Sequence, residues 1–429
     1  MDLDKIKKIH FIGIGGIGIS AIARLMNMEG KKVSGSDMSD SPILKSLSDI
    51  GIKTIIGQNA KNIPENTDLI IHTIAISKDN PEIIEAQSRN IKIATYPEML
   101  SVISKNMKTV AVSGTHGKTT TTAMLSKIMV DAGLDPTVIV GSLMKDSSSN
   151  LIVGKSNYFL VEACEYRRSF LNLYPNILII TNIEEDHLDY YKDLTDIQSA
   201  FRELVVRVPD DGALICNVSD PRLKSILYGL KCKVINYSTY IDPNLKLKVL
   251  GEHNRQNAGA CLAVANFLKI DRNKAKKSLE EFSGTWRRFD LRGKTKSGTL
   301  IYDDYAHHPS EIMATLKGMK EMYPDLRRVA FFQPHLFSRT KSLLDQFSKS
   351  FVAVDEIYVL PIYAAREEFD SSINSSMLVE KIKSAGKKAY YLESFSEALI
   401  CINKLGEMDV VVNLGAGDIY KLSESAVSV

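Results

Sequence analysis

A lysine and two threonines after a short glycine-rich loop have the residue types and spacing to bind a nucleoside triphosphate. The segment reads Ser113-Gly114-Thr115-His116-Gly117-Lys118-Thr119-Thr120. In phosphate-binding loops the backbone N–H groups face the anion, the lysine reaches the β/γ-phosphates and the next hydroxyl holds Mg²⁺. Lys118 and Thr119 fit these two roles. The strict pattern also needs a glycine at position 112, where this chain has Val112. The loop is therefore a shortened variant that contains a histidine.

A second glycine-rich loop lies near the N-terminus. Residues 13–18 read Gly-Ile-Gly-Gly-Ile-Gly and match G-x-G-x-x-G, and an aspartate follows about 20 positions on. Such a loop lets a diphosphate approach a helix N-terminus, and the acidic residue can accept a hydrogen bond from a ribose hydroxyl. The candidates are Gly13, Gly15, Gly16, Gly18 and Asp37. Any nucleoside diphosphate suits this loop, so the pattern indicates the fold more strongly than it indicates NAD. Close packing of helix on strand accounts for at least one of Gly15 and Gly16.

Polar side chains also follow two apolar segments downstream of the phosphate loop. Glu162 ends the segment at 158–161, and His187 follows the one at 177–180. If both segments are strands of one parallel sheet, their carboxyl ends share an edge with the phosphate loop. Mg²⁺ prefers oxygen ligands, so Glu162 suits it better than His187 does. Further on, His253, Asn254 and Asn257 stand at a predicted helix start, where an N-cap role is the plain alternative.

The last third of the chain repeats apolar strand, polar loop and helix. The four predicted strands are at 300–303, 328–332, 357–360 and 409–412. A doubly wound sheet gathers the loops that follow its strands at one edge, where ligands bind. His307, His308 and His335 lie in two of these loops, Arg339 stands shortly after His335, and Asp418 lies in the loop after the last strand. This clustering favours a binding site over histidines that merely face solvent.

Three alternating β/α segments must position these residues. A chain of 429 residues is too long for one core. The pattern predicts an α/β protein with a Rossmann-like domain at 1–105, a central P-loop ATPase domain at 106–293 and a Rossmann-like domain at 294–429. Two nucleotide-binding loops and a loop-rich third domain indicate that ATP is spent on a nucleotide-linked substrate.

Composition narrows the class of protein. The net charge is +3, from 54 basic and 51 acidic residues, and no long basic run occurs. We therefore expect neither nucleic acid nor a membrane as a partner. The five cysteines form no C-x-x-C pair, which is typical of reduced thiols in a cytoplasmic protein. The sequence has no signal-peptide pattern and no apolar run of membrane-spanning length.

The whole chain resembles the Mur ligases of peptidoglycan synthesis. The matching stretches occur in the family's order, at 10–16, 114–120, 181–187, 287–289, 303–309, 333–340 and 414–418. The resemblance is strongest to members that add L-alanine to UDP-N-acetylmuramate. It implies that the lactyl carboxylate attacks the γ-phosphate of ATP, and that the amine of L-alanine then attacks the resulting acylphosphate. UDP-N-acetylmuramate and L-alanine would be the partners, ATP and two Mg²⁺ ions the cofactors, and the protein a monomer or weak homodimer.

The resemblance also implies roles for particular residues. The first domain would bind the UDP-sugar rather than NAD, through the glycines and Asp37 named above. Catalytic roles fall to Lys118, Glu162, His187 and Arg339. The implied metal ligands are Thr119, Glu162 and His187. The amino acid would meet Tyr305, His307 and Arg339. The implied ATP contacts are Gly114, Thr115, His116, Gly117, Lys118, Thr119, Thr120, His253, Asn254, Asn257 and Arg288.

The chain departs from the family pattern at three places. Residues 162–167 read Glu-Ala-Cys-Glu-Tyr-Arg where many members are more acidic, and Leu336 stands where some members have an additional arginine. We interpret the first as a subfamily difference and Arg339 as the carboxylate anchor. The stretch 238–251 is shorter than the family's usual strand-rich insertion.

Three alternative functions remain open on the sequence. A murein-peptide ligase adds a recycled tripeptide to the same UDP-sugar and shares the Glu-Ala-Cys-Glu-Tyr feature, but the loop at 333–340 favours the single-amino-acid enzyme. An NAD-dependent dehydrogenase explains the first glycine-rich loop and leaves the phosphate loop unexplained. An inactive nucleotide sensor conflicts with the intact Lys118, Glu162 and His187.

Overall fold

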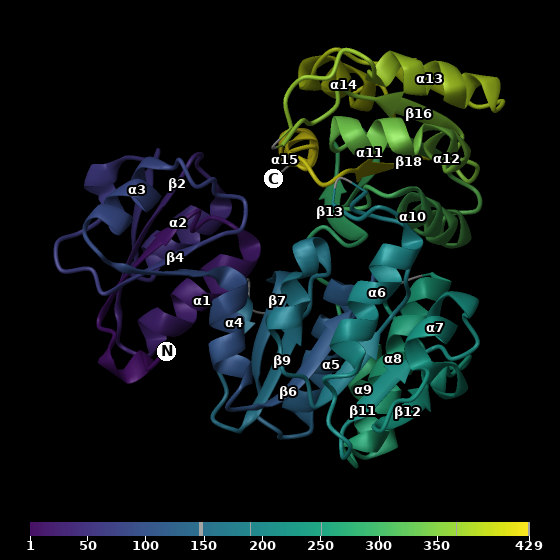
Figure 1. Ribbon diagram of the computed structural model, residues 1–429. Helices are drawn as coiled ribbons and strands as arrows, with labels where there is room; N and C mark the ends of the chain where they lie inside the picture. Colours follow the sequence, from purple (N-terminus) through teal and green to yellow (C-terminus); the bar gives the residue numbers. More distant parts are fainter. Residues whose placement is uncertain (146–148, 189, 250, 366, 428–429) are drawn as a thin grey trace.

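The computed structural model describes residues 1–145, 149–188, 190–249, 251–365 and 367–427. Its strands form three sheets, one in each third of the chain (Figure 1). The predicted α/β architecture is confirmed. Nearly all strand pairs are parallel, and their residues are mostly apolar and buried, because helices cover both faces of such a sheet.

The first sheet has the strand order β3-β2-β1-β4-β5 and is parallel throughout. Its strands are β1 (Lys8–Ile12), β2 (Lys32–Asp37), β3 (Lys53–Ile56), β4 (Leu69–His72) and β5 (Lys92–Thr95). The accompanying helices are α1 (Ile17–Met28), α2 (Pro42–Asp49), α3 (Pro81–Ser88) and α4 (Tyr96–Ser104). The chain reverses between β1 and α1 within the first glycine-rich loop, and Gly16 is the N-cap of α1.

The central sheet has the order β12-β11-β10-β6-β9-β7-β8, in which only β7 and β8 pair antiparallel. Its strands are β6 (Lys108–Ser113), β7 (Thr137–Met144), β8 (Ser149–Ile152), β9 (Tyr158–Glu162), β10 (Ile177–Ile180), β11 (Ala213–Cys216) and β12 (Lys233–Asn236). Its helices are α5 (Lys118–Asp131), α6 (Leu194–Val205), α7 (Lys224–Leu227), α8 (Glu252–Phe267) and α9 (Arg272–Glu281). Because β9 and β10 flank β6, the loops after all three strands meet at one edge.

The third sheet has the order β13-β14-β18-β15-β16-β17. Its strands are β13 (Asp290–Lys294), β14 (Leu300–Asp304), β15 (Arg327–Phe332), β16 (Glu356–Val359), β17 (Lys388–Tyr391) and β18 (Asp409–Leu414). Its helices are α10 (Pro309–Met322), α11 (Phe337–Ser342), α12 (Leu344–Lys349), α13 (Ser375–Ser384), α14 (Phe395–Ile402) and α15 (Lys421–Ala426). Strand β13 crosses the predicted boundary at 293/294 and pairs with β14, so we propose that the third domain begins near Asp290.

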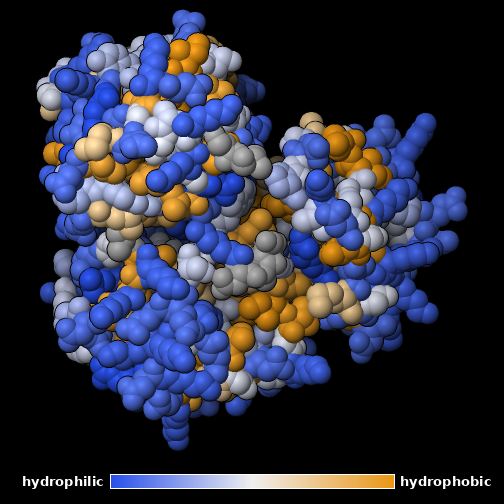
Figure 2. All heavy atoms as spheres, turned by 180° about the vertical axis from the view of Figure 1, so that it is seen from behind, coloured by the Kyte–Doolittle hydropathy of each residue, from blue (hydrophilic) through white to orange (hydrophobic). Residues whose placement is uncertain are grey.

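The first domain packs on the central one through α1 and α4, which contact β7, β8 and a 3₁₀ segment at Tyr166–Asn172. Apolar residues of both domains join one buried cluster there, and from behind hydrophobic side chains are visible where the lobes meet (Figure 2). Asn150 of β8 is fully buried and donates from Nδ2 to Ser20 Oγ at 3.1 Å and to the carbonyl of Ile17. This amide fixes the start of α1, beside the first glycine-rich loop, against the central sheet.

None of the helices in the described part of the chain is both long and apolar enough to cross a membrane.

We expect Asn150→Ala to lower the free energy of unfolding by about 1–3 kcal/mol, because the buried Ser20 Oγ loses its donor, Asn150 Nδ2. The Ile17 carbonyl keeps the Ser20 hydroxyl as a donor, at 2.9 Å. Urea unfolding followed by circular dichroism measures the loss. The matched control is Asn403→Ala, at an exposed residue after α14, for which we expect little change. Equal unfolding curves for the two variants would contradict this role of Asn150.

Candidate active site

The phosphate loop joins β6 to α5 and places Lys118 in the first turn of the helix. Gly114 and Gly117 have φ of +132° and +82°, a conformation that glycine adopts readily. Lys118 Nζ donates to the carbonyls of Gly114 and Thr115 at 2.6 and 3.0 Å. It also lies 2.9 Å from Glu165 Oε2. Burial alone would lower the pKa of Lys118, but the nearby acidic groups, Glu165 foremost, raise that pKa above its ordinary value.

Glu165 is a site residue that the sequence analysis missed. Its side chain is buried, and Oε1 lies 3.5 Å from His187 Nε2. Burial would raise the pKa of Glu165, but the charge of Lys118 and the contact with His187 hold it below the usual range. Glu165 therefore joins two predicted catalytic residues. The sequence offers only its position three residues after Glu162, and no general rule makes that position part of a site.

Glu162 and Thr119 form a pair of oxygen donors at the carboxyl edge of the central sheet. Thr119 Oγ1 donates to Glu162 Oε2 at 2.9 Å, and the backbone N–H of Gly141 donates to the same oxygen at 2.9 Å. A hydroxyl and a carboxylate side by side fit the preference of Mg²⁺ for oxygen. His187 has φ of +55°, and among the residues that the structure describes its buried Nδ1 has no hydrogen-bond partner. Such a nitrogen is free to bind a ligand.

Side chains from all three domains line one cavity of about 510 Å³. All four predicted catalytic residues line it, together with both other residues predicted to meet the amino acid: Lys118, Glu162, His187, Arg339, Tyr305 and His307. Residues of the first domain also line it, among them Ile17, Gly18 and Tyr96. The structure thus brings together predicted catalytic residues that are up to 221 positions apart, from Lys118 to Arg339.

A second cavity of about 310 Å³ lies on the other side of the phosphate loop. Seven of the predicted ATP-contact residues line it: His116, Gly117, Thr120, His253, Asn254, Asn257 and Arg288. Thr115, Lys118 and Thr119 line the main cavity instead, and Gly114 is in neither lining.

The N-cap alternative for the segment at 253–257 is wrong. Gly251 is the N-cap residue of α8, so His253 and Asn254 lie inside its first turn. Burial lowers the pKa of His253 to about 4. Asn257 Nδ2 donates to Asn254 Oδ1 at 3.2 Å. A neutral imidazole beside two amides can hydrogen-bond an uncharged heterocycle.

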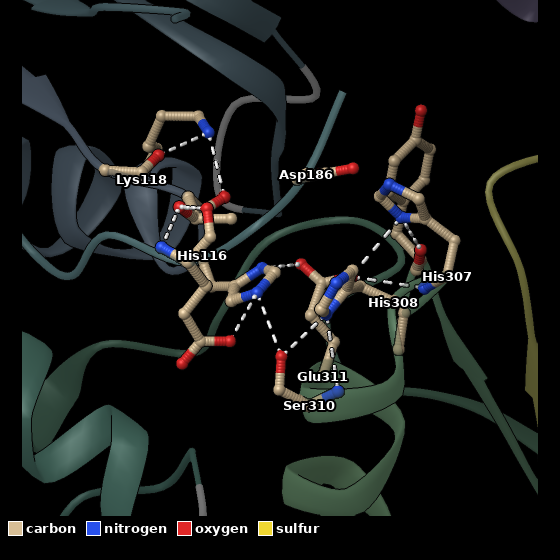
Figure 3. A network of polar contacts seen from close by, with 12 residues as sticks. His116, Lys118, Asp186, His307, His308, Ser310 and Glu311 are labelled. Carbon is tan, nitrogen blue, oxygen red and sulfur yellow. Dashed lines mark hydrogen bonds and ion pairs between the residues drawn. The ribbon is translucent and has the colours of Figure 1, made fainter. Parts of the chain in front are cut away.

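His116 connects the phosphate loop to the third domain (Figure 3). Its Nδ1 lies 3.2 Å from Glu311 Oε1, and its Nε2 lies 2.9 Å from Ser310 Oγ and 3.4 Å from Glu184 Oε2. Burial opposes protonation, yet the two carboxylates raise the pKa of His116 to about 9. Glu184, Ser310 and Glu311 were not among the predicted site residues. Ser310 and Glu311 reach His116 only because α10 docks on the central domain, whereas Glu184 belongs to the loop after β10 of the central domain itself.

A second charged contact crosses the same interface. Arg339 of α11 donates from Nε and Nη2 to Asp186 Oδ1 at 3.2 and 3.0 Å, and both side chains are buried. Arg339 Nη1 also lies 3.2 Å from His335 Nδ1. Burial lowers the pKa of the neighbouring His307 to about 4, so this imidazole is neutral at pH 7. Arg339 therefore supplies positive charge at this end of the main cavity.

Two other residues that the sequence singled out, Tyr305 and Asp418, contact side chains within the protein. The Tyr305 ring faces the guanidinium groups of Arg287 and Arg288, at 5.0 and 5.2 Å from its centroid. Asp418 accepts from Gln333 Nε2 at 3.0 Å, which holds the β15 and β18 loops together rather than placing the carboxylate in the main cavity lining.

The first glycine-rich loop is held by the aspartate predicted to bind ribose. The N–H of Gly15 donates to Asp37 Oδ2 at 2.8 Å. The packing interpretation concerned Gly15 and Gly16, where a Cβ would lie 2.9 Å from Asp37 Oδ2 and 3.2 Å from the Ile19 side chain. Space is also short at Gly13 and Gly18, where a Cβ would lie 2.5 Å from the Thr73 side chain and 2.8 Å from the ring of Tyr96. A ribose contact of Asp37 stays a prediction.

Family models match most of the chain. They are "Mur ligase family, catalytic domain" at residues 8–108, "Mur ligase middle domain" at 112–243 and "Mur ligase, glutamate ligase domain" at 287–417. The chain belongs to the Mur ligase family.

Individual relatives cover the chain almost completely. The chain is 42% identical over 450 residues to UDP-N-acetylmuramate–L-alanine ligase of Clostridium acetobutylicum, covering 98% of both chains. It is 42% identical over 451 residues to the enzyme of that name from Clostridium kluyveri, covering 99% of this chain and 98% of the relative. The crystal structure of UDP-N-acetylmuramate-alanine ligase MurC from Thermotoga maritima matches with a TM-score of 0.83 at 31% identity, over 97% of each chain. A murein peptide ligase from Psychrobacter arcticus shares the fold, with a TM-score of 0.75 at 24% identity over 98% of each chain.

We expect the contribution of His116 to stability to depend on pH. The pKa of His116 is about 9 in the folded protein, against an ordinary value of 6.5, so pairing with Glu184 and Glu311 stabilises fully below pH 6.5. That contribution is lost as pH rises through about 9. The difference in melting temperature between the wild type and His116→Asn should therefore shrink between pH 6.5 and 10. A constant difference across this range would mean that His116 is not charged in the fold.

Proposed function

We propose that this chain joins L-alanine to UDP-N-acetylmuramate and cleaves ATP to ADP and phosphate. One observation carries the proposal: the phosphate-loop Lys118, the carboxylate Glu162 and the guanidinium of Arg339 share one cavity whose walls come from all three domains. This arrangement suits three substrates that must meet at one point. The names of the full-length relatives supply the particular sugar nucleotide and amino acid.

The first step would join two negatively charged groups. A lactyl carboxylate attacks the γ-phosphorus of ATP, the bond to the β,γ-bridging oxygen breaks, and an acylphosphate and ADP result. Lys118 reduces the repulsion because its ammonium group lies at the phosphate loop and is kept charged by Glu165. The paired Glu165 also limits the rotation of the lysine side chain.

The second step would form the amide bond. The amine of L-alanine attacks the acyl carbon, and phosphate leaves from the tetrahedral intermediate. Arg339 would hold the carboxylate of L-alanine through its positive charge and through the second N–H of Nη2, since only one N–H of that nitrogen is directed at Asp186. An acylphosphate hydrolyses in water, so the contacts of His116 and Arg339 across the interface have a second use: they keep the third domain over the cavity.

Two Mg²⁺ ions complete the proposal. Thr119 and Glu162 would hold one ion, and His187, with its unpartnered Nδ1, would contribute to the second. Bound Mg²⁺ screens the negative charge of the phosphates. A cytoplasmic location and a monomeric or weakly dimeric state also remain predictions.

The test is phosphate release from ATP in the presence of UDP-N-acetylmuramate and Mg²⁺. L-alanine, glycine, L-serine and the murein tripeptide are compared in parallel. Release that needs the sugar nucleotide and is fastest with L-alanine supports the proposal. Release that needs the tripeptide would make the chain a murein-peptide ligase, and release independent of the sugar nucleotide would overturn both.

We expect Lys118→Ala to reduce kcat at least about 10²-fold, because charge developing on the phosphates loses its cation. UDP-N-acetylmuramate binding, measured by isothermal titration calorimetry, should stay nearly intact since the first domain supplies that site. Lys127→Ala, on the same helix, is the control and should keep full activity; its ion pairs lie with Asp131 and Glu281. Loss of sugar-nucleotide binding in Lys118→Ala would show that the two sites are not separable.

We expect Glu162→Gln to need at least about tenfold more Mg²⁺ for half-maximal activity, since a neutral amide is a weaker ligand for a divalent cation than a carboxylate. The measurement is a Mg²⁺ titration at saturating substrates. Glu185→Gln removes a carboxylate from an exposed residue of the β10 loop and serves as the control. An unchanged Mg²⁺ requirement in Glu162→Gln would remove this residue from the metal site.

A further inference from the structure

Leu336 has a backbone conformation that side-chain-bearing residues rarely adopt. It follows β15 and precedes α11, with φ of +71° and ψ of +134°. Its neighbours hold this conformation: its N–H donates to the carbonyl of Tyr363 at 2.9 Å. Its own carbonyl accepts from the N–H of Thr340 at 3.1 Å and from the Thr340 hydroxyl at 2.8 Å. Backbone strain that the surroundings maintain is concentrated at functional sites, so the side chain at this position needs an explanation.

The Leu336 side chain stands between two cavities. On one side is the main cavity, at the end formed by His335 and Arg339. On the other side is a third cavity of about 480 Å³, whose polar lining includes Ser338, Lys341 and Asp370. Four residues line both cavities: Asp186, His187, Leu336 and Arg339. These four side chains form the wall that separates the two spaces.

Of the four wall residues, Leu336 is the one whose side chain has no polar group. Asp186 and Arg339 are joined in a buried ion pair, and removing either partner would leave a buried charge uncompensated. His187 contacts Glu165. Leu336 is apolar, is only 1% exposed and contributes bulk alone. The space available beside Arg339 therefore depends on the volume of this side chain.

We propose that Leu336 determines specificity by restricting the acceptor to a single amino acid with a small side chain. The inference rests on the proposed function, in which Arg339 holds the carboxylate of the amino acid. Leu336 lies three residues before Arg339, at the start of the same helix. A larger side chain, or a second residue linked by a peptide bond, extends from the amino acid into the wall. Beyond the wall the third cavity has room for it.

The test compares substrates within one preparation of each variant. Leu336→Gly removes the side chain and suits the backbone conformation, and Leu336→Ala removes most of the volume. The ratio of kcat/KM for L-valine, L-leucine and the murein tripeptide to that for L-alanine should rise at least about tenfold for one or more of them, as expected for removing a methyl-sized clash. KM for ATP and for UDP-N-acetylmuramate should stay within about twofold of the wild type, because only the amino-acid end of the cavity is altered.

Two control variants test whether a change in selectivity comes from the volume of the Leu336 side chain. Leu188→Ala makes the same chemical change at a half-exposed residue that lines only the third cavity, so the ratios should stay at the wild-type values. Leu336→Met keeps the volume and should also retain them. Because each ratio is taken within one sample, a loss of folded protein cancels. If Leu336→Gly is inactive with every amino acid, Leu336→Ala decides.

The outcomes separate this inference from the proposed function. Wild-type protein that releases phosphate with L-alanine, together with Leu336 variants that keep its selectivity, would overturn the specificity role alone. The specificity role would also be overturned if Leu188→Ala broadened selectivity as much as Leu336→Ala does. Wild-type protein with no phosphate release on L-alanine would overturn the proposed function itself.

Discussion

The ammonium group of Lys118 is a buried charge, and the site is built around the need to compensate it. Burial favours the neutral amine, which would be useless for binding phosphate. Glu165 prevents this at 2.9 Å, and the carbonyls of Gly114 and Thr115 accept the remaining hydrogen bonds. Glu165 in turn contacts His187, so the phosphate loop, the β9 loop and the β10 loop are linked through polar side chains. A parallel sheet that brings these three loops to one edge is the fold that permits this.

The same principle governs the interface with the third domain. His116 lies between Glu184 of the central domain and Glu311 of α10, and Arg339 lies against Asp186. When the domains separate, water must replace these partners, so the contacts favour the docked arrangement only modestly in net terms. The two contacts that cross the interface are nevertheless directional: His116 of the phosphate loop pairs with Glu311 of α10, and Asp186 of the β10 loop pairs with Arg339 of α11. Docking therefore orders the residues that face the substrates.

Sequence reasoning predicted the parts of the site that follow from local patterns. Lys118, Thr119, Glu162 and His187 were placed together because each follows a buried apolar strand, and parallel strands share their carboxyl edge. The same reasoning predicted the position of Arg339 after β15. It could not predict Glu311 or Asp186 as partners, because their contacts depend on how two domains dock, which no local spacing encodes.

Two other differences have local physical causes. The fingerprint predicts a ribose contact for Asp37, which stays a prediction. The structure adds a contact that the pattern does not specify: Asp37 Oδ2, at the end of β2, accepts from the N–H of Gly15 in the first glycine-rich loop. The predicted boundary at 293/294 fell inside β13, because a short antiparallel edge strand such as Asp290–Lys294 lacks the long apolar run that marks the central strands.

Different domains bound different parts of the cavity, which explains why the unusual backbone conformation of Leu336 can matter for specificity. The proposed nucleotide contacts use loop backbone and charged groups whose positions the sheets determine, so they tolerate little change. The end of the cavity proposed for the amino acid is different: it is bounded by the β15 loop, where the conformation of Leu336 is held by Tyr363 and Thr340. Loops on a rigid scaffold can change shape without disturbing the sheet. A family that keeps its ATP chemistry can thus alter the acceptor through a few residues of this loop, and the strained position beside Arg339 is the point at which the change in volume would be felt first.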